Sequence, residues 1–163
     1  MRVKGHDSTT VWIAVAGSDK GLGAARDELA TALKDPARAL ARKREAREKL
    51  ASHTRVSLPG DRRLEAGIDW GKQNLADATQ SARDLQIRYT DQGKQYPQPA
   101  GTVKSVRWFG AGWPDYPWIF ATDGEYTAFA GVALGQFETA EDHMRALRDI
   151  SEIANEGSGK VAH

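Results

Sequence analysis

One segment of the sequence gathers residue types that could do chemistry. Eight of the thirteen aromatic residues lie between Trp108 and Phe129, interrupted by glycines, prolines and isolated carboxylates. Sugar rings present apolar C–H faces and many hydroxyl groups, so aromatic side chains and carboxylates together suit a carbohydrate ligand. Aromatic walls also exclude water from a carboxyl group and favour its protonated form, which a general acid must have. Asp123, after Phe120 and before Tyr126, is the carboxyl that best fits such a role.

The same residues also allow a purely structural interpretation. Asp123 precedes a helix predicted to begin at Gly124, where an aspartate commonly caps backbone N–H groups. Asp115 lies close to two prolines, as turn residues do, and Trp113 and Trp118 would then be ordinary core residues. The two interpretations are compatible for Asp123, since a cap also holds a carboxylate in place.

The elements that must position this segment are mostly helices. Apolar residues recur at helical spacing over residues 22–33, 64–85, from 124 onward and from a Thr139 cap to 154. The Asp-Pro pair at 35–36 predicts a further helix over 36–52, rich in alanine, arginine and lysine and poor in large apolar residues. Asp35 and Asp61 precede two of these helices as capping residues. A β-branched run over 9–15 predicts a strand. Glycines and prolines between 90 and 114 predict a long loop that holds a short strand at 103–108.

Composition excludes several classes of protein. Lysine and arginine total 23 against 22 acidic residues, so the chain lacks the basic surplus that binds nucleic acid. There is no cysteine, and the four histidines form no close pair, so we expect no metal site. No apolar run has the length of a membrane span, and no secretion signal opens the sequence. We therefore expect no cofactor, no nucleic-acid or membrane partner and a cytoplasmic location.

Glycines near the N-terminus imitate a nucleotide-binding turn. Gly17, Gly21 and Gly23 follow the predicted strand and precede a helix, a spacing that resembles the cofactor turn of short-chain dehydrogenases. A doubly wound fold next needs an apolar strand, but residues 35–52 supply a charged helix instead. The YxxxK motif of that family is also missing. NAD(P) binding is therefore kept only as an alternative.

Three motifs carry a resemblance to a known family: Asp69–Leu75 (DWGKQNL), 112–123 (GWPDYPWIFATD) and 159–163 (GKVAH). In order and spacing they make residues 12–163 resemble the amylo-α-1,6-glucosidase family, which includes the C-terminal domain of glycogen debranching enzymes. In such enzymes a Pro-Trp-Phe run leads into an aspartate that opens a barrel helix and acts as general acid. Asp123 occupies that place, with Ala121-Thr122 before it where the family usually has Gly-Gly or Gly-Arg.

The resemblance implies a mainly α fold, a partial (α/α)6 toroid of helical hairpins preceded by the last strand of a β-sandwich and a helical linker. Residues 1–19 would be the end of the β-sandwich domain and 20–61 the linker. Residues 62–163 would be the first part of the catalytic domain. The chain would then be an internal fragment of a longer enzyme.

The resemblance also implies a glycoside hydrolase that cleaves α-glucosidic linkages of an oligo- or polysaccharide with inversion. Asp123 would be the general acid, and the base would lie beyond His163, so the chain alone would be inactive. A non-catalytic carbohydrate-binding helical protein is the alternative, and glycogen, a trehalose-like sugar and another glucoside all stay open as substrates. The residues expected to bind substrate are Trp113, Asp115, Trp118, Trp70 and Lys72.

Overall fold

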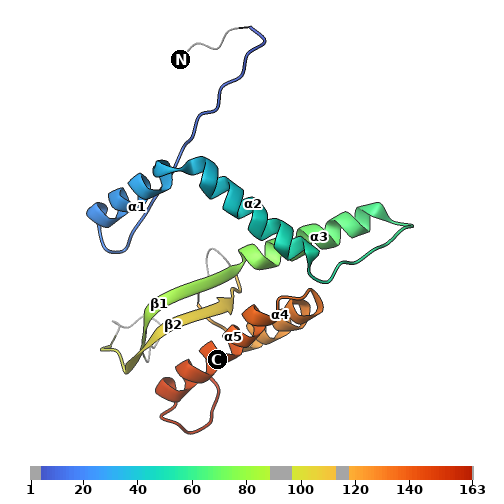
Figure 1. Cartoon of the computed structure of the whole chain (residues 1–163). Helices are drawn as coiled ribbons and strands as arrows, with labels where there is room; N and C mark the ends of the chain where they lie inside the picture. The colour runs from blue at the N-terminus through green and yellow to red at the C-terminus, as the bar shows by residue number, and fades with distance from the viewer. Residues whose placement is uncertain (1–4, 89–96, 113–117, 163) are drawn as a thin grey trace. The chain divides into compact units, whose positions relative to one another are not determined.

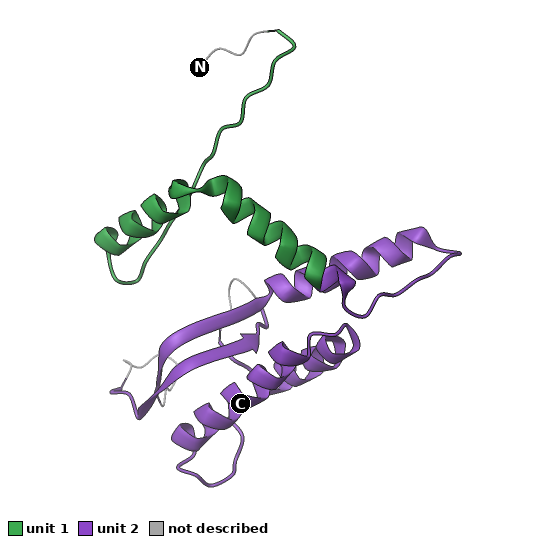
Figure 2. Ribbon diagram, in the orientation of Figure 1, with its two compact units in different colours: residues 1–49 green, residues 50–163 purple. Residues whose placement is uncertain are grey.

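The computed structural model describes residues 5–88, 97–112 and 118–162, which contain five helices and two strands (Figure 1). The chain divides into two compact units, Met1–Lys49 and Leu50–His163 (Figure 2). The division falls inside the segment 20–61 that the resemblance assigns to a linker. The domain boundaries expected from that resemblance stay predictions.

Unit 1 holds two consecutive helices that match the sequence pattern. Helix α1 spans Leu22–Lys34, and α2 spans Pro36–Ser52, its last residues belonging to unit 2. Asp35 caps α2, because its Oδ1 accepts the backbone N–H of Arg38 at 2.9 Å. Neither helix has a buried residue. Their formation therefore reflects local propensity and capping more than packing.

The strand predicted over residues 9–15 is wrong. These residues form neither helix nor strand, and Val11, Ile13 and Val15 are 63%, 88% and 94% exposed. A β-branched run becomes a strand only when a neighbouring strand pairs with its backbone, and the described residues offer it none. The NAD(P) alternative loses its premise with that strand. Gly21 instead serves as the N-cap residue of α1, at a φ of 100° that glycine tolerates.

Helix α3 begins where the sequence predicts but ends earlier. It spans Arg62–Asp77, and Asp61 Oδ1 accepts the N–H groups of Arg63 and Leu64 at 3.1 and 3.0 Å. Residues 79–85, expected to continue the helix, belong instead to strand β1, Thr79–Ile87. The spacing of Ala82 and Leu85 fits a helix and not the two-residue period of a strand, so pairing with β2 overrides the local pattern here.

The core of unit 2 lies between a two-stranded sheet and one helix. Strand β2, Gly101–Phe109, confirms and extends the strand predicted at 103–108, and it pairs antiparallel with β1, Thr79 opposite Phe109. Helix α5, Phe137–Ala154, packs against β2, and helix α4, Ala121–Ala133, packs against α5 (Figure 1). The buried core cluster consists of Ile87, Val103, Val106, Trp108, Ala146 and Ile150.

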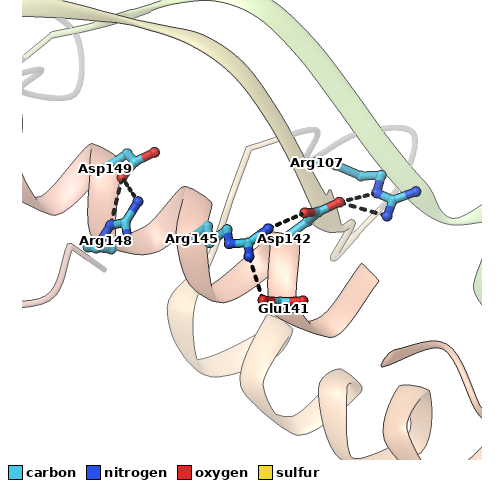
Figure 3. A network of polar contacts seen from close by, with 6 residues as sticks. All are labelled: Arg107, Glu141, Asp142, Arg145, Arg148 and Asp149. Atoms are coloured by element: carbon cyan, nitrogen blue, oxygen red, sulfur yellow. Dashed lines mark hydrogen bonds and ion pairs between the residues drawn. The ribbon is translucent and has the colours of Figure 1, made fainter. Parts of the chain in front are cut away.

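A polar network reinforces the contact between β2 and α5 (Figure 3). Asp142 Oδ2 of α5 accepts hydrogen bonds from Arg107 of β2, from Nε at 2.7 Å and from Nη2 at 2.6 Å. Arg145 lies one turn along α5 and pairs with Glu141 at 2.5 Å and with Asp142 at 3.6 Å. Two bonds from one guanidinium fix the orientation of β2 on α5 more firmly than a single ion pair would.

The structure is thus a mixed fold, mainly helical with a small antiparallel sheet. This agrees with the mainly α class expected from the sequence, without the β-sandwich strand. The α4–α5 pair is a helical hairpin of the kind from which toroids are built. The closed toroid itself stays part of the proposal below.

Candidate functional site

Asp123 lies in the first turn of α4 and is exposed. The helix begins at Ala121, three residues earlier than predicted, and Phe120 is its N-cap residue with no side-chain capping bond. The interpretation of Asp123 as the cap is therefore wrong. Its carboxylate sits near the positive end of the helix dipole without being committed to a backbone N–H cap. The described residues therefore do not form the water-excluding aromatic walls expected from the sequence, and the side chain lies exposed on a rigid element.

Exposed aromatic side chains lie on both sides of Asp123 in the sequence. Trp118 is 56% exposed and contacts Phe120 edge to face, with ring centroids 6.3 Å apart. Tyr126 and Phe129 are 73% and 74% exposed and form a second pair with centroids 6.4 Å apart. Tyr126 follows Asp123 by three residues, so the two side chains are neighbours on the helix surface. Of the other predicted site residues, Trp113 and Asp115 lie outside the described residues.

Two glycines set the orientation of α4. A Cβ on Gly124 would lie 1.9 Å from His143 Cε1, and a Cβ on Gly131 would lie 2.6 Å from Phe109 Cζ. The glycines are seven residues apart, two helical turns, so they mark one face that presses against α5 and β2. Tyr126 and Phe129 also recur at helical spacing, but they lie on an exposed part of the helix surface. The glycine face is buried because the tight packing there admits no side chain.

His143 is fully buried between α4 and β2. Its ring lies 6.1 Å from that of Phe109, and neither ring nitrogen has a hydrogen-bond partner among the described residues. Burial lowers the pKa of the imidazole, and the Glu125 carboxylate partly opposes that shift. The neutral ring is therefore favoured in the folded state. Its position next to Gly124 makes it a packing residue at the base of the site.

The predicted start of α5 is three residues late. The helix begins at Phe137 with Gln136 as its N-cap residue, so Thr139 is not the cap. The buried stripe includes Leu147 and Ile150 as expected, but Met144 is 52% exposed. That exposure leaves an apolar side chain on the surface that α5 shares with α4.

Two hollows lie along the surface of α4 and α5, and Asp123 lines neither. The first, which we call the polar pocket, has a volume of about 310 Å³. It is lined by charged and hydroxyl side chains over an apolar floor of Met144, Leu147 and Val161. The polar members of its lining are Glu125, Arg148, Ser151, Glu152 and Lys160.

The second hollow, which we call the aromatic groove, has a volume of about 860 Å³. Tyr126, Phe129 and Phe137 line it, with Glu125 and Met144 where it meets the polar pocket. Thr122, Glu125, Tyr126 and Phe129 lie three, four and seven residues apart, which is one face of a helix. This spacing indicates from the sequence that the four residues share one face of the helix. It does not indicate whether that face is buried or exposed.

The segment 159–161, part of the GKVAH motif, lines one side of the polar pocket. Asn155 Nδ2 donates to the carbonyl of Lys160 at 2.6 Å, and the N–H of Ala162 donates to Ser151 Oγ at 2.8 Å. Ala162 also packs against the core cluster. The structure therefore brings this motif next to the first turns of α4, although 36 residues separate Glu125 from Val161 in the chain.

The structure corrects the expectation that Trp70 and Lys72 both bind the substrate. Trp70 is 69% exposed, whereas Lys72 is buried, at 1% exposure. Lys72 Nζ donates to the Ala51 carbonyl at 3.4 Å, and the Lys72 carbonyl accepts from Gln136 Nε2 at 3.1 Å. Residues two apart on a helix point in different directions, so both cannot face the same ligand.

Burial lowers the pKa of the Lys72 ammonium, an effect that Asp69 opposes and Arg55 reinforces. A buried amine with one long hydrogen bond favours its neutral form. The bond from Gln136 ties α3 to the turn that joins α4 and α5. Lys72 thus supports the fold of unit 2 rather than the ligand surface.

The described residues contain no candidate metal cluster and no helix that could span a membrane. No group of three or more histidine and carboxylate side chains there could hold a metal ion. Among the same residues, no helix is both long and apolar enough to cross a membrane.

Comparisons with protein-family models, curated proteins and solved structures found no match for this chain.

Proposed function

We propose that the chain is part of a glycoside hydrolase that acts on α-glucosidic linkages, as the amylo-α-1,6-glucosidase family does. The observation that carries the proposal is the placement of Asp123. Its carboxyl is exposed on the first turn of α4, with the Trp118–Phe120 pair before it and the Tyr126–Phe129 pair after it. A carboxyl beside aromatic faces is what a sugar-cleaving site requires.

In the proposed reaction Asp123 acts as general acid. Its carboxyl proton passes to the glycosidic oxygen as the bond between that oxygen and the anomeric carbon breaks. Water attacks the anomeric carbon from the opposite face and gives its proton to a second carboxylate, which inverts the configuration. We place that base on a helix outside this chain, so that hydrolysis requires the assembled enzyme. The carboxyls of inverting enzymes stand roughly 6.5–9.5 Å apart, which leaves room for the water.

The helices of unit 2 would contribute to an (α/α)6 toroid. The α4–α5 hairpin supports this proposal, since α4 packs closely against α5 where Gly124 meets His143. Helix α3 supports it as well, because Leu64 and Trp70 are 54% and 69% exposed and would pack against a further helix or a substrate. We propose Trp113, Asp115 and Trp118 as the subsite for the non-reducing sugar.

The test compares two substitutions in an enzyme that contains this chain. Asp123→Asn is nearly isosteric but cannot donate the carboxyl proton, so we expect kcat on maltose- and isomaltose-type oligosaccharides to fall by about 100-fold or more. Glu138→Gln is the matched control, because Glu138 is an exposed acid in the first turn of α5. Both substitutions remove a similar helix-dipole interaction, about 0.3–1 kcal/mol.

Wild-type activity in Asp123→Asn would refute the assignment of the acid. Equal losses of activity in both variants would trace the effect to helix stability instead. Sugar binding without hydrolysis in the wild-type enzyme would favour the alternative, a carbohydrate-binding helical protein.

A further inference from the structure

The polar pocket and the aromatic groove meet at two shared residues, Glu125 and Met144. They form one continuous surface along α4 and α5 with different chemistry at its two ends. Asp123 lies on the adjacent face of α4, next to Tyr126. Asp123 itself lines neither hollow.

The polar pocket contains charged side chains that form no hydrogen bond or ion pair with other described residues. The side chains of Glu125, Glu152 and Lys160 make no hydrogen bond or ion pair with the residues the structure describes. Arg148 is already paired with Asp149, at 2.7 and 2.8 Å (Figure 3). With Arg148 neutralised by Asp149, two carboxylates and one ammonium remain, a small net negative charge that favours a neutral ligand over an anion.

The walls of this pocket are preformed. Leu147 of the floor is buried at 4% exposure, and the opposite wall is fastened to α5 through Asn155 and Ser151. A volume of about 310 Å³ is at the lower end of small-molecule sites, which span roughly 300–1,000 Å³. The pocket therefore suits one small ring better than a larger ligand.

We propose that the surface binds a neutral oligosaccharide, with one pyranose ring in the polar pocket and the next ring on the Tyr126–Phe129 pair. In the pocket, the C–H face of the ring lies over Met144, Leu147 and Val161. Its hydroxyls donate to Glu125 and Glu152 and accept from Lys160, bonds that a charged partner strengthens. The second ring stacks on the exposed aromatic pair. The inference rests on the proposed function for its ligand class and adds the residues that hold it.

The test is an NMR titration of the whole 163-residue chain with methyl α-glucoside, maltose and isomaltose. With each of the three sugars we expect changes in the amide chemical shifts of Glu125 and Lys160. The sugar concentration is raised to about 100 mM, which is high enough to detect a millimolar Kd. Both disaccharides should also shift the amides of Tyr126 and Phe129. If no amide of the polar pocket shifts, the proposal is overturned, whether or not amides elsewhere shift.

Paired substitutions separate the two halves of the surface. Glu125→Gln with Glu152→Gln should weaken all three sugars about tenfold, the effect of losing bonds to a charged group. Tyr126→Ala with Phe129→Ala should weaken only the disaccharides, again by about tenfold. Glu138→Gln, which lines neither hollow, is the control and should leave every affinity unchanged.

A titration with a negatively charged sugar tests whether the pocket prefers a neutral ligand. Glucuronate should bind no more tightly than methyl α-glucoside, because the uncommitted charges of the pocket are net negative. Tighter binding of glucuronate would overturn the neutral-sugar assignment. Sugar binding that persists in the Glu125→Gln, Glu152→Gln variant would overturn the assignment of the pocket.

The two proposals fail in different ways. If the sugars bind as expected while Asp123→Asn remains fully active in the assembled enzyme, the catalytic assignment is wrong and the binding surface stands. If Asp123→Asn is inactive while the titration shows no contact at the polar pocket, the function stands and the binding surface is wrong.

Discussion

Two ionisable side chains, Lys72 and His143, lie in the interior of unit 2. For both, burial is the largest cause that lowers the pKa, because a charged form loses water that the protein does not replace. Lys72 keeps one hydrogen bond, to Ala51, whereas neither nitrogen of His143 has a partner among the described residues. We therefore expect acidification to destabilise the fold first through the protonation of His143.

We expect the free energy of unfolding to fall as the pH drops below about 6.5, the pKa of histidine in an unfolded chain. The pKa of His143 in the folded state is lower, so the unfolded state takes up the proton first and gains stability. The slope from this one group is at most about 1.4 kcal/mol per pH unit. Above pH 7 its contribution is fully present and independent of pH.

Urea unfolding of the wild type and of His143→Gln between pH 5 and pH 8 measures this effect. Glutamine cannot take up a proton in this range, so the variant should lose less stability on acidification. The difference between the two proteins should be constant above pH 7. Parallel curves down to pH 5 would show that His143 is protonated equally in both states.

At the scale of elements, the packing of α4 depends on the absence of side chains at two positions. Gly124→Ala would place a methyl group 1.9 Å from the ring of His143, and Gly131→Ala would place one 2.6 Å from Phe109. Neither neighbour can move easily, since both are buried, at 0% and 1% exposure. We expect each substitution to reduce the free energy of unfolding by about 1–3 kcal/mol.

Gly67→Ala is the matched control for these substitutions. Gly67 lies inside α3, and a Cβ there would meet nothing within 4 Å. Alanine favours a helix over glycine by roughly 0.5–1 kcal/mol, so this variant should be more stable than the wild type. Thermal or urea unfolding of the three variants gives the signs directly. A stabilising Gly124→Ala would contradict the close packing of α4 on His143.

At the scale of the whole molecule, burial is distributed unevenly along the chain. Helices α1 and α2 contain no buried residue, whereas the core cluster draws on β1, β2 and α5. We expect hydrogen exchange to be slowest for amides of β2 and α5 and fast throughout α1 and α2. Exchange measured residue by residue at neutral pH gives the ranking. Comparable protection in α1 and β2 would contradict it.

The sequence predicted the elements whose formation is local. Asp35 and Asp61 cap α2 and α3 as expected, because a cap is recognised by residues only two or three positions away. It failed for residues 9–15 and 79–85, where the presence or absence of a pairing strand decides the outcome. A strand is a relation between two segments, so neither segment alone determines it.

The candidate site divides in the same way. From the sequence alone came the aromatic segment, Asp123 as the carboxyl that best fits an acid role, and the resemblance that implies that role. Only the tertiary structure decided that Tyr126 and Phe129 face outward, that Lys72 is buried, and that the segment 159–161 walls a pocket with Glu125. Helical periodicity identifies a face but not its direction. That direction is set by steric contact, here by Gly124 and Gly131 against His143 and Phe109.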